Sequence, residues 1–231
     1  MKRTFVMFGA VLLCASTALA DLSSSETKRL SEAASTVREL RGAPDNGIPE
    51  DLWNRAECVA VIPGLKKAAF IVGGEFGKGV ISCRSGQTWS APVFLELQKG
   101  SAGFQIGAEQ VDVVLLMMNR TGVEKMLGNK VNLGADASVA AGPVGRAASA
   151  STDGRLEAEI LAYSRAKGAF AGINLSGGVL RPDKDANVDA YGSGTASQDV
   201  LFKATVPTPS GAEAFVRTLG SESRATTGRK P

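Results

Sequence analysis

The chain has 231 residues, which is enough for one medium-sized domain or two small ones. Its 44% apolar and 21% charged residues are typical of a globular protein and exclude a wholly disordered chain, collagen and a multi-pass membrane protein. Histidine is absent, which excludes Ser-His-Asp and Cys-His catalysis and histidine metal sites. The formal net charge of +3 is too small to indicate nucleic-acid binding.

The first twenty residues have the three parts of a secretory signal peptide. Lys2 and Arg3 are basic, residues 5–15 form a short apolar run, and an A-x-A cleavage motif ends at Ala20. Removal of this leader takes away two of the 26 basic residues and leaves 24 against 23 acidic ones, a net charge of +1. We therefore expect a periplasmic or secreted protein that is soluble or peripheral to a membrane.

Two cysteines remain after the leader, Cys58 and Cys83. An even number of cysteines in an oxidising compartment favours a disulfide. Two buried thiols on strands would fit the sequence equally well, so both alternatives stay open.

An amphipathic helix is predicted over about residues 23–41. Ser23 and Glu26 fit a capping box, and Gly42 is a suitable stop. Apolar residues then recur at helical spacing, at Leu30, Ala33, Ala34, Val37 and Leu40. This helix could lie on a membrane, with Lys28, Arg29 and Arg38 on the headgroups, or dock onto the rest of the protein. The alanine-rich stripe without an aromatic anchor favours docking.

The remaining chain predicts a short helix from Pro49, then repeated short strands, and a few helices. Apolar runs alternate with glycine and Pro63-Gly64, which indicates a curled, mainly antiparallel sheet or a partial barrel. Further helices are predicted at 121–127 and from a capping box at 210–213 to Leu219. We expect a single α+β domain over 21–220 and a disordered tail at 221–231. The apolar runs are 59–62, 68–72, 80–83, 93–97, 104–107 and 111–117.

Three polar or glycine-rich segments are candidate chemical sites. Residues 134–146 could bind an anion through backbone N–H groups, with help from Arg146. Tight packing of small residues is favoured instead, because the segment fits neither the P-loop nor the dinucleotide-binding motif. Residues 73–79 are predicted to be a hairpin connection rather than a kinase loop. Residues 183–189 lack the glycine and glutamate of a calcium loop, which favours a polar turn. No paired acid and base emerges, so we expect no enzyme activity, no cofactor and no metal.

Two basic segments are candidates for phosphate or lipid headgroups. Lys66 and Lys67 follow Pro63-Gly64, and Arg165 and Lys167 could join the same positive patch. A solvated turn is the alternative for the first pair.

Nine segments occur in a characteristic order along the chain: Pro63–Gly74, Gly77–Val80, Trp89–Pro92, Gly103–Gly107, Gly134–Arg146, Tyr163–Arg165, Lys167-Gly168, Gly177-Gly178 and Arg181–Asp183. Together they resemble the SYLF-domain family, a lipid-binding domain also found in yeast actin regulators. The resemblance extends over about residues 30–192. It implies a binding module whose eukaryotic relatives bind acidic lipids and in some cases actin, and it places Lys66 and Lys67 at the family's basic pair.

Sequence alone thus predicts an envelope module that binds acidic phospholipid through a basic patch and the first helix. The alternative is a structural or protein-interaction module of the envelope without a lipid ligand. The candidate lipid-binding residues are Lys66, Lys67, Lys28, Arg29, Arg38, Arg146, Arg165 and Lys167.

Overall fold

The computed structural model describes residues 22–42, 47–69, 72–102, 107–143, 158–166, 169–203 and 205–220. The expected leader, the expected tail, Arg146 and Lys167 lie outside these residues.

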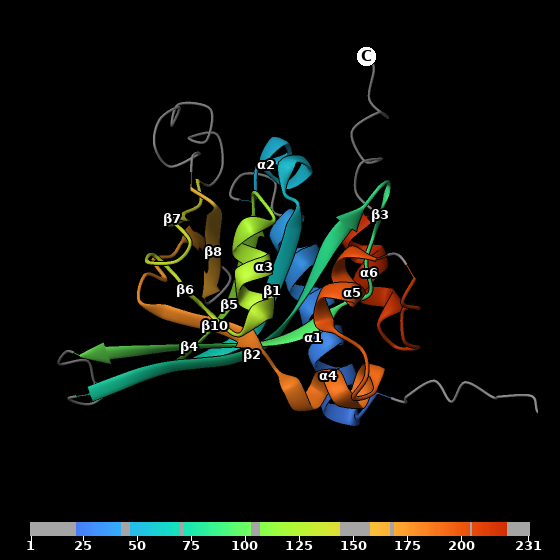
Figure 1. Ribbon diagram of the computed structural model, residues 1–231. Helices are drawn as coiled ribbons and strands as arrows, with labels where there is room; N and C mark the ends of the chain where they lie inside the picture. The colour runs from blue at the N-terminus through green and yellow to red at the C-terminus, as the bar shows by residue number, and fades with distance from the viewer. Residues whose placement is uncertain are drawn as a thin grey trace, which may run out of the picture.

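The fold is built on one curled sheet of ten strands, shown in Figure 1. Its main strand order is β6-β10-β4-β2-β1-β5-β8-β7, with β3 added to β2 and β9 added to β8. All pairings are antiparallel except β7 with β8. The expected α+β class with a curled, mainly antiparallel sheet is confirmed. The strands are β1 Cys58–Ala69, β2 Val72–Ser85, β3 Thr88–Trp89, β4 Val93–Ala102, β5 Gly107–Met117, β6 Val131–Asn132, β7 Val139–Ala141, β8 Ile160–Ala166, β9 Ala169–Gly172 and β10 Gly178–Pro182.

Helices cover both faces of the sheet, so that successive residues of a central strand enter different cores. Val59 and Val61 of β1 pack with α1, α2 and α6, whereas Ala60 and Ile62 pack with α3 and α5. Burial on both faces explains why the strands are continuous apolar runs without visible alternation. The helices are α1 Ser24–Arg41, α2 Glu50–Arg55, α3 Thr121–Gly128, α4 Lys184–Tyr191, α5 Ser197–Phe202 and α6 Glu213–Gly220.

Helix α1 has the predicted capping box, in which Ser23 and Glu26 each accept a backbone hydrogen bond from the other. Its apolar stripe is at most 2% exposed and packs onto the sheet. Of the two placements left open, the helix is docked. Within the described part of the chain, none of the helices has the length and apolarity needed to cross a bilayer.

The Pro63-Gly64 pair does not end a strand as predicted. It forms a β-bulge inside β1, because three residues from Ile62 to Leu65 advance the register by only two on β5. Gly64 has a φ of +58°, which glycine adopts readily. On the neighbouring strand, a Cβ on Gly79 would lie only 2.2 Å from the Val61 carbonyl oxygen, so this close approach requires glycine. Runs 59–62 and 68–69 are therefore parts of one strand.

Two other local predictions were wrong. Residues 73–79 are not a hairpin connection but lie within β2, because their glycines allow close packing beside the bulge of β1. Residues 184–191 are not a polar turn but form α4, preceded by Asp183 as its N-cap. Helix α5 was not predicted at all.

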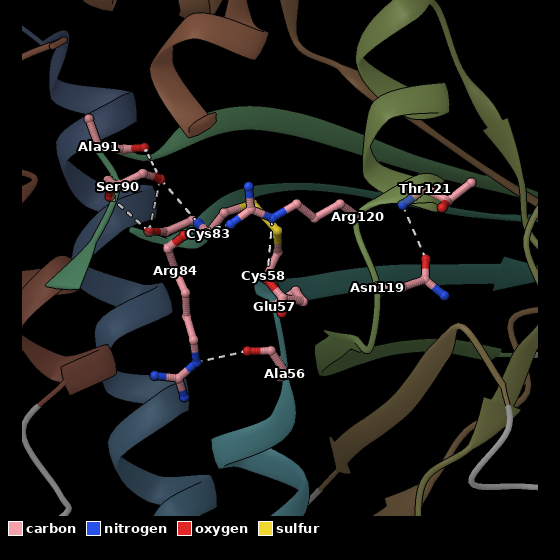
Figure 2. Close-up of a disulfide and its surroundings, with 11 residues drawn as sticks. Ala56, Glu57, Cys58, Cys83, Arg84, Ser90, Ala91, Asn119, Arg120 and Thr121 are labelled. Carbon is pink, nitrogen blue, oxygen red and sulfur yellow. Dashed lines mark hydrogen bonds and ion pairs between the residues drawn. A yellow bond between two sulfur atoms is a disulfide. The ribbon is translucent and has the colours of Figure 1, made fainter. Parts of the chain in front are cut away.

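A disulfide joins Cys58 and Cys83, which are direct cross-strand partners on β1 and β2. Both residues are fully buried. Figure 2 shows the bond beside Arg84, which donates to the Ala56 carbonyl, and near Arg120, which pairs with Glu57.

Candidate functional site

A groove of about 660 Å³ lies between helix α1 and strands β1, β2 and β5. One side is the polar edge of α1, including Lys28, Glu32 and Glu39. The opposite side is formed by β1, β2 and β5, including Lys66 and Phe76. The groove therefore combines cations, carboxylates and one large apolar side chain.

The bulge of β1 determines where this groove opens. Beyond it, parts of four strands continue past the helices, and we call this four-stranded segment the arm (residues 66–69, 72–76, 98–102 and 107–111). Figure 1 shows β2 and β4 extending together away from the rest of the sheet. The Gly64 N–H donates to Asp112 Oδ1 at 2.9 Å and fastens the bulge to β5. Lys66 is the second residue beyond that contact.

On the groove side of the arm, four directly opposed residues form a row across the strands. The row runs Gln110, Lys66, Phe76 and Gln98, from β5 through β1 and β2 to β4. Phe76 is 42% exposed, unusually high for a large apolar residue here. Lys66 is also exposed and makes no ion pair within the described residues. An exposed cation thus stands beside an exposed aromatic ring.

The opposite face of the arm carries a different row. Here the order is Glu109, Lys67, Glu75 and Lys99, so each charge stands opposite its counter-charge on the next strand. Because successive side chains of a strand point to opposite faces, Lys66 and Lys67 cannot belong to one patch. Only Lys66 lies at the groove.

A buried carboxylate, Asp183, pairs with two of the cations that line the groove, Arg29 and Lys78. Asp183 Oδ2 lies 2.9 Å from Arg29 Nη1 and 2.9 Å from Lys78 Nζ. Burial alone would raise the pKa of the Asp183 carboxyl, but the hydrogen bonds and charges of Lys78 and Arg29 outweigh it and lower the pKa below 3.8. The hydrogen bond from Lys78 to Asp183 in turn raises the pKa of the lysine.

Arg29 was predicted to contact lipid, but the structure places it in the interior. Its side chain is 10% exposed, and its guanidinium lies 5.2 Å from the centre of the Phe94 ring. Arg165 is similarly engaged, because it pairs with Glu39 and lies 3.7 Å from Asp112 Oδ2. Both residues hold α1 to the sheet, and neither presents a free cation at the surface.

Lys28, Arg38 and Lys66 remain exposed cations among the predicted residues that the structure describes. Lys28 and Lys66 line the same groove, whereas Arg38 does not line it. Lys28 is 76% exposed and stands 3.8 Å from Glu32, an i,i+4 pair at the surface. Such a solvated pair contributes little and leaves the lysine available.

Sequence reasoning missed Phe76, Lys78 and Asp183. Phe76 lies in a glycine-rich stretch that resembled a turn but is part of β2. The signal that could have identified Asp183 is its place directly after an apolar strand and before a helical segment, as an N-cap. Within the described residues, no three acidic or cysteine side chains form a group that could hold a metal ion.

Comparison with known proteins places these features in a family. A family model described as "Ysc84: Las17-binding protein actin regulator" matches residues 98–222, just over half of the chain. Protein YSC84 of Saccharomyces cerevisiae is 36% identical over 210 residues, which cover 87% of this chain and 43% of that protein.

Two further relatives show the same partial coverage. LAS seventeen-binding protein 3 of S. cerevisiae is 37% identical over 80% of this chain, and human SH3 domain-containing YSC84-like protein 1 is 31% identical over 85%. The matched regions span 41% and 58% of those two proteins. The chain therefore belongs to the Ysc84 family, which carries the SYLF domain that the ordered sequence segments resembled.

Proposed function

We propose that this chain binds anionic phospholipid surfaces through the mouth of the groove. Lys66 and Lys28 contact headgroup phosphates, and Phe76 enters the interfacial region. The observation that carries the proposal is the exposed Lys66, which has no ion-pair partner in the described part of the chain, beside the exposed Phe76, in a row with a glutamine at each end. A cation next to an aromatic ring suits the boundary between headgroups and acyl chains.

The energetic scale of such a contact is modest. A basic residue near an anionic membrane contributes about 1 kcal/mol, or roughly a fivefold change in affinity. Two exposed lysines therefore give weak, salt-sensitive binding, to which partial burial of Phe76 adds an apolar contribution. Because α1 is docked, this mechanism uses Lys28 on its polar edge, while the apolar stripe stays in the core.

We further propose that the contact occurs in a cell envelope, after removal of the leader at residues 1–20. The buried Cys58–Cys83 disulfide supports this placement, since disulfides persist mainly in oxidising compartments.

Two adjacent lysines on opposite faces provide a matched pair for the test. Residues 21–231 would be sedimented with neutral phosphatidylcholine vesicles and with vesicles containing phosphatidylglycerol, at low and moderate salt. We expect binding to the anionic vesicles only, weakened about fivefold by Lys66→Gln and unchanged by Lys67→Gln. Equal loss in both variants, or equal binding to both vesicle types, would refute the lysine mechanism.

A second candidate function is protein binding, because a relative's own name describes it as a LAS seventeen-binding protein. Binding of envelope proteins that is insensitive to salt, together with no vesicle binding at any salt concentration, would favour this function over lipid binding.

A further inference from the structure

The outer edge of β5 is open along the arm. β5 pairs with β1 along its whole length, from Gly107 to Met117. It pairs with β8 only from Asp112 onwards, because β8 ends at Ala166 and pairs with β9 along its other edge. Within the described residues, no strand therefore lies beside the outer edge of 107–111. An open edge of this kind can accept another extended segment.

The hydrogen-bond pattern shows which groups this edge offers. The Met118 N–H donates to the Glu159 carbonyl oxygen at 2.8 Å, on the side of β5 that faces β8. Backbone direction alternates along an antiparallel strand, so the even-numbered residues of β5 point their N–H and C=O groups to that side. Ala108 and Gln110 therefore present two donors and two acceptors at the open edge.

Charge indicates which segment fits this edge. The row of Lys99, Glu75, Lys67 and Glu109 alternates in sign across the four strands and ends with Glu109 on β5. A fifth strand would place one side chain directly opposite Glu109 on the same face. A cation there continues the alternation, whereas a carboxylate would be repelled.

We propose that this edge binds an extended segment of a partner protein, antiparallel to β5, with a lysine or arginine opposite Glu109. A second copy of the chain is a poorer occupant, because a two-fold pairing centred on Glu109 would set two glutamates against each other. This inference does not depend on lipid binding, since Lys66 lies on the other face of the arm.

The test uses a fluorescent Thr-Val-Lys-Val-Thr peptide and residues 21–231, with binding followed by anisotropy. The central lysine faces Glu109, and the two valines face Ala108 and Gln110. We expect saturable binding that weakens about tenfold when the lysine is replaced by glutamate. Glu109→Lys should reverse the preference between the two peptides.

Backbone methylation distinguishes strand addition from simple charge attraction. N-methylation of both valines removes the N–H groups that would bond to β5 and should abolish binding. N-methylation of the central lysine alters an N–H that points away and should leave binding intact. In the protein, Ala108→Pro removes one of the two N–H donors at the open edge and should abolish peptide binding. Vesicle binding should persist, because proline is tolerated on an edge strand where the N–H points outward.

Three results would overturn the proposal. They are no saturable binding of the lysine peptide, binding that survives valine methylation, and a sedimentation profile in which Ala108→Pro turns a dimer into a monomer. The last would mean that a second copy occupies the edge.

Discussion

Asp183 joins α1 to the sheet through charge, since it receives Arg29 from the helix and Lys78 from β2. Its side chain is only 4% exposed, so its negative charge depends on these two partners. Lys78 is 42% exposed and can be hydrated on its own, whereas Arg29 is buried. Loss of the carboxylate would therefore leave one uncompensated buried charge.

We predict that Asp183→Asn lowers the free energy of unfolding by about 3 kcal/mol, the usual cost of breaking a buried pair by removing one partner. Urea unfolding at pH 7 measures this loss. Glu213→Gln is a suitable control, because it removes a carboxylate from an exposed i,i+4 pair with Arg217 and should change stability by less than about 1 kcal/mol. Equal effects would show that the Asp183 network contributes no more than a surface pair.

Asp183 also makes the free energy of unfolding depend on pH. The folded pKa of Asp183 lies below 3.8, so the folded state binds this proton less readily than the unfolded chain. Its contribution is present above the unfolded pKa and is lost as the pH falls through the folded pKa. Stability of Asp183→Asn should thus fall less steeply than that of the native chain below about pH 4. If the free energies of unfolding of the two proteins fell equally steeply with decreasing pH, this prediction would be wrong.

In the proposed lipid mechanism, α1 supplies Lys28 from its polar edge while its apolar stripe stays packed in the core. Leu30 is 1% exposed and lies in the core beneath the helix. We predict that Leu30→Ala lowers the free energy of unfolding by about 3 kcal/mol through the cavity it leaves. Anionic vesicle binding, measured well below the melting temperature, should be unchanged because Leu30 does not reach the lipid.

The opposite result would identify insertion. If Leu30→Ala weakened vesicle binding while the protein remained folded by circular dichroism, the helix would have to leave the sheet to bind. Lys28→Gln serves as the control on the same helix. It should weaken vesicle binding about fivefold without affecting stability beyond about 0.5 kcal/mol.

Among the elements, α1 was predictable because it depends on local signals, a capping box and a stripe at helical spacing. The bulge in β1 was not, since Pro63-Gly64 has the same composition whether it ends a strand or bends one. Only pairing with β2 and β5 distinguishes the two. Once Lys66 and Lys67 are known to lie on a strand, it follows that their side chains point to opposite faces of the sheet. The burial of Arg29 depended on Asp183, which lies 154 residues away.

At the scale of the whole molecule, the disulfide and the candidate surfaces lie at different ends of β1. Cys58 begins the strand, whereas Lys66 lies beyond the bulge, in the arm. The bond closes a loop with a sequence separation of 25 residues. In the loop-entropy model, closure of such a loop stabilises the folded state by about 3 kcal/mol.

We therefore predict that a reducing agent lowers the free energy of unfolding of residues 21–231 by about 3 kcal/mol, measured by urea unfolding with thiol titration to confirm reduction. The double variant Cys58→Ala/Cys83→Ala should be similarly destabilised and insensitive to the reducing agent. While the reduced protein remains folded, vesicle binding should persist, because Lys28, Lys66 and Phe76 lie away from the bond. Unchanged stability after full reduction would mean that the bond adds nothing to the fold. Lost vesicle binding in folded, reduced protein would mean that the Cys58–Cys83 disulfide and the groove are coupled through β1.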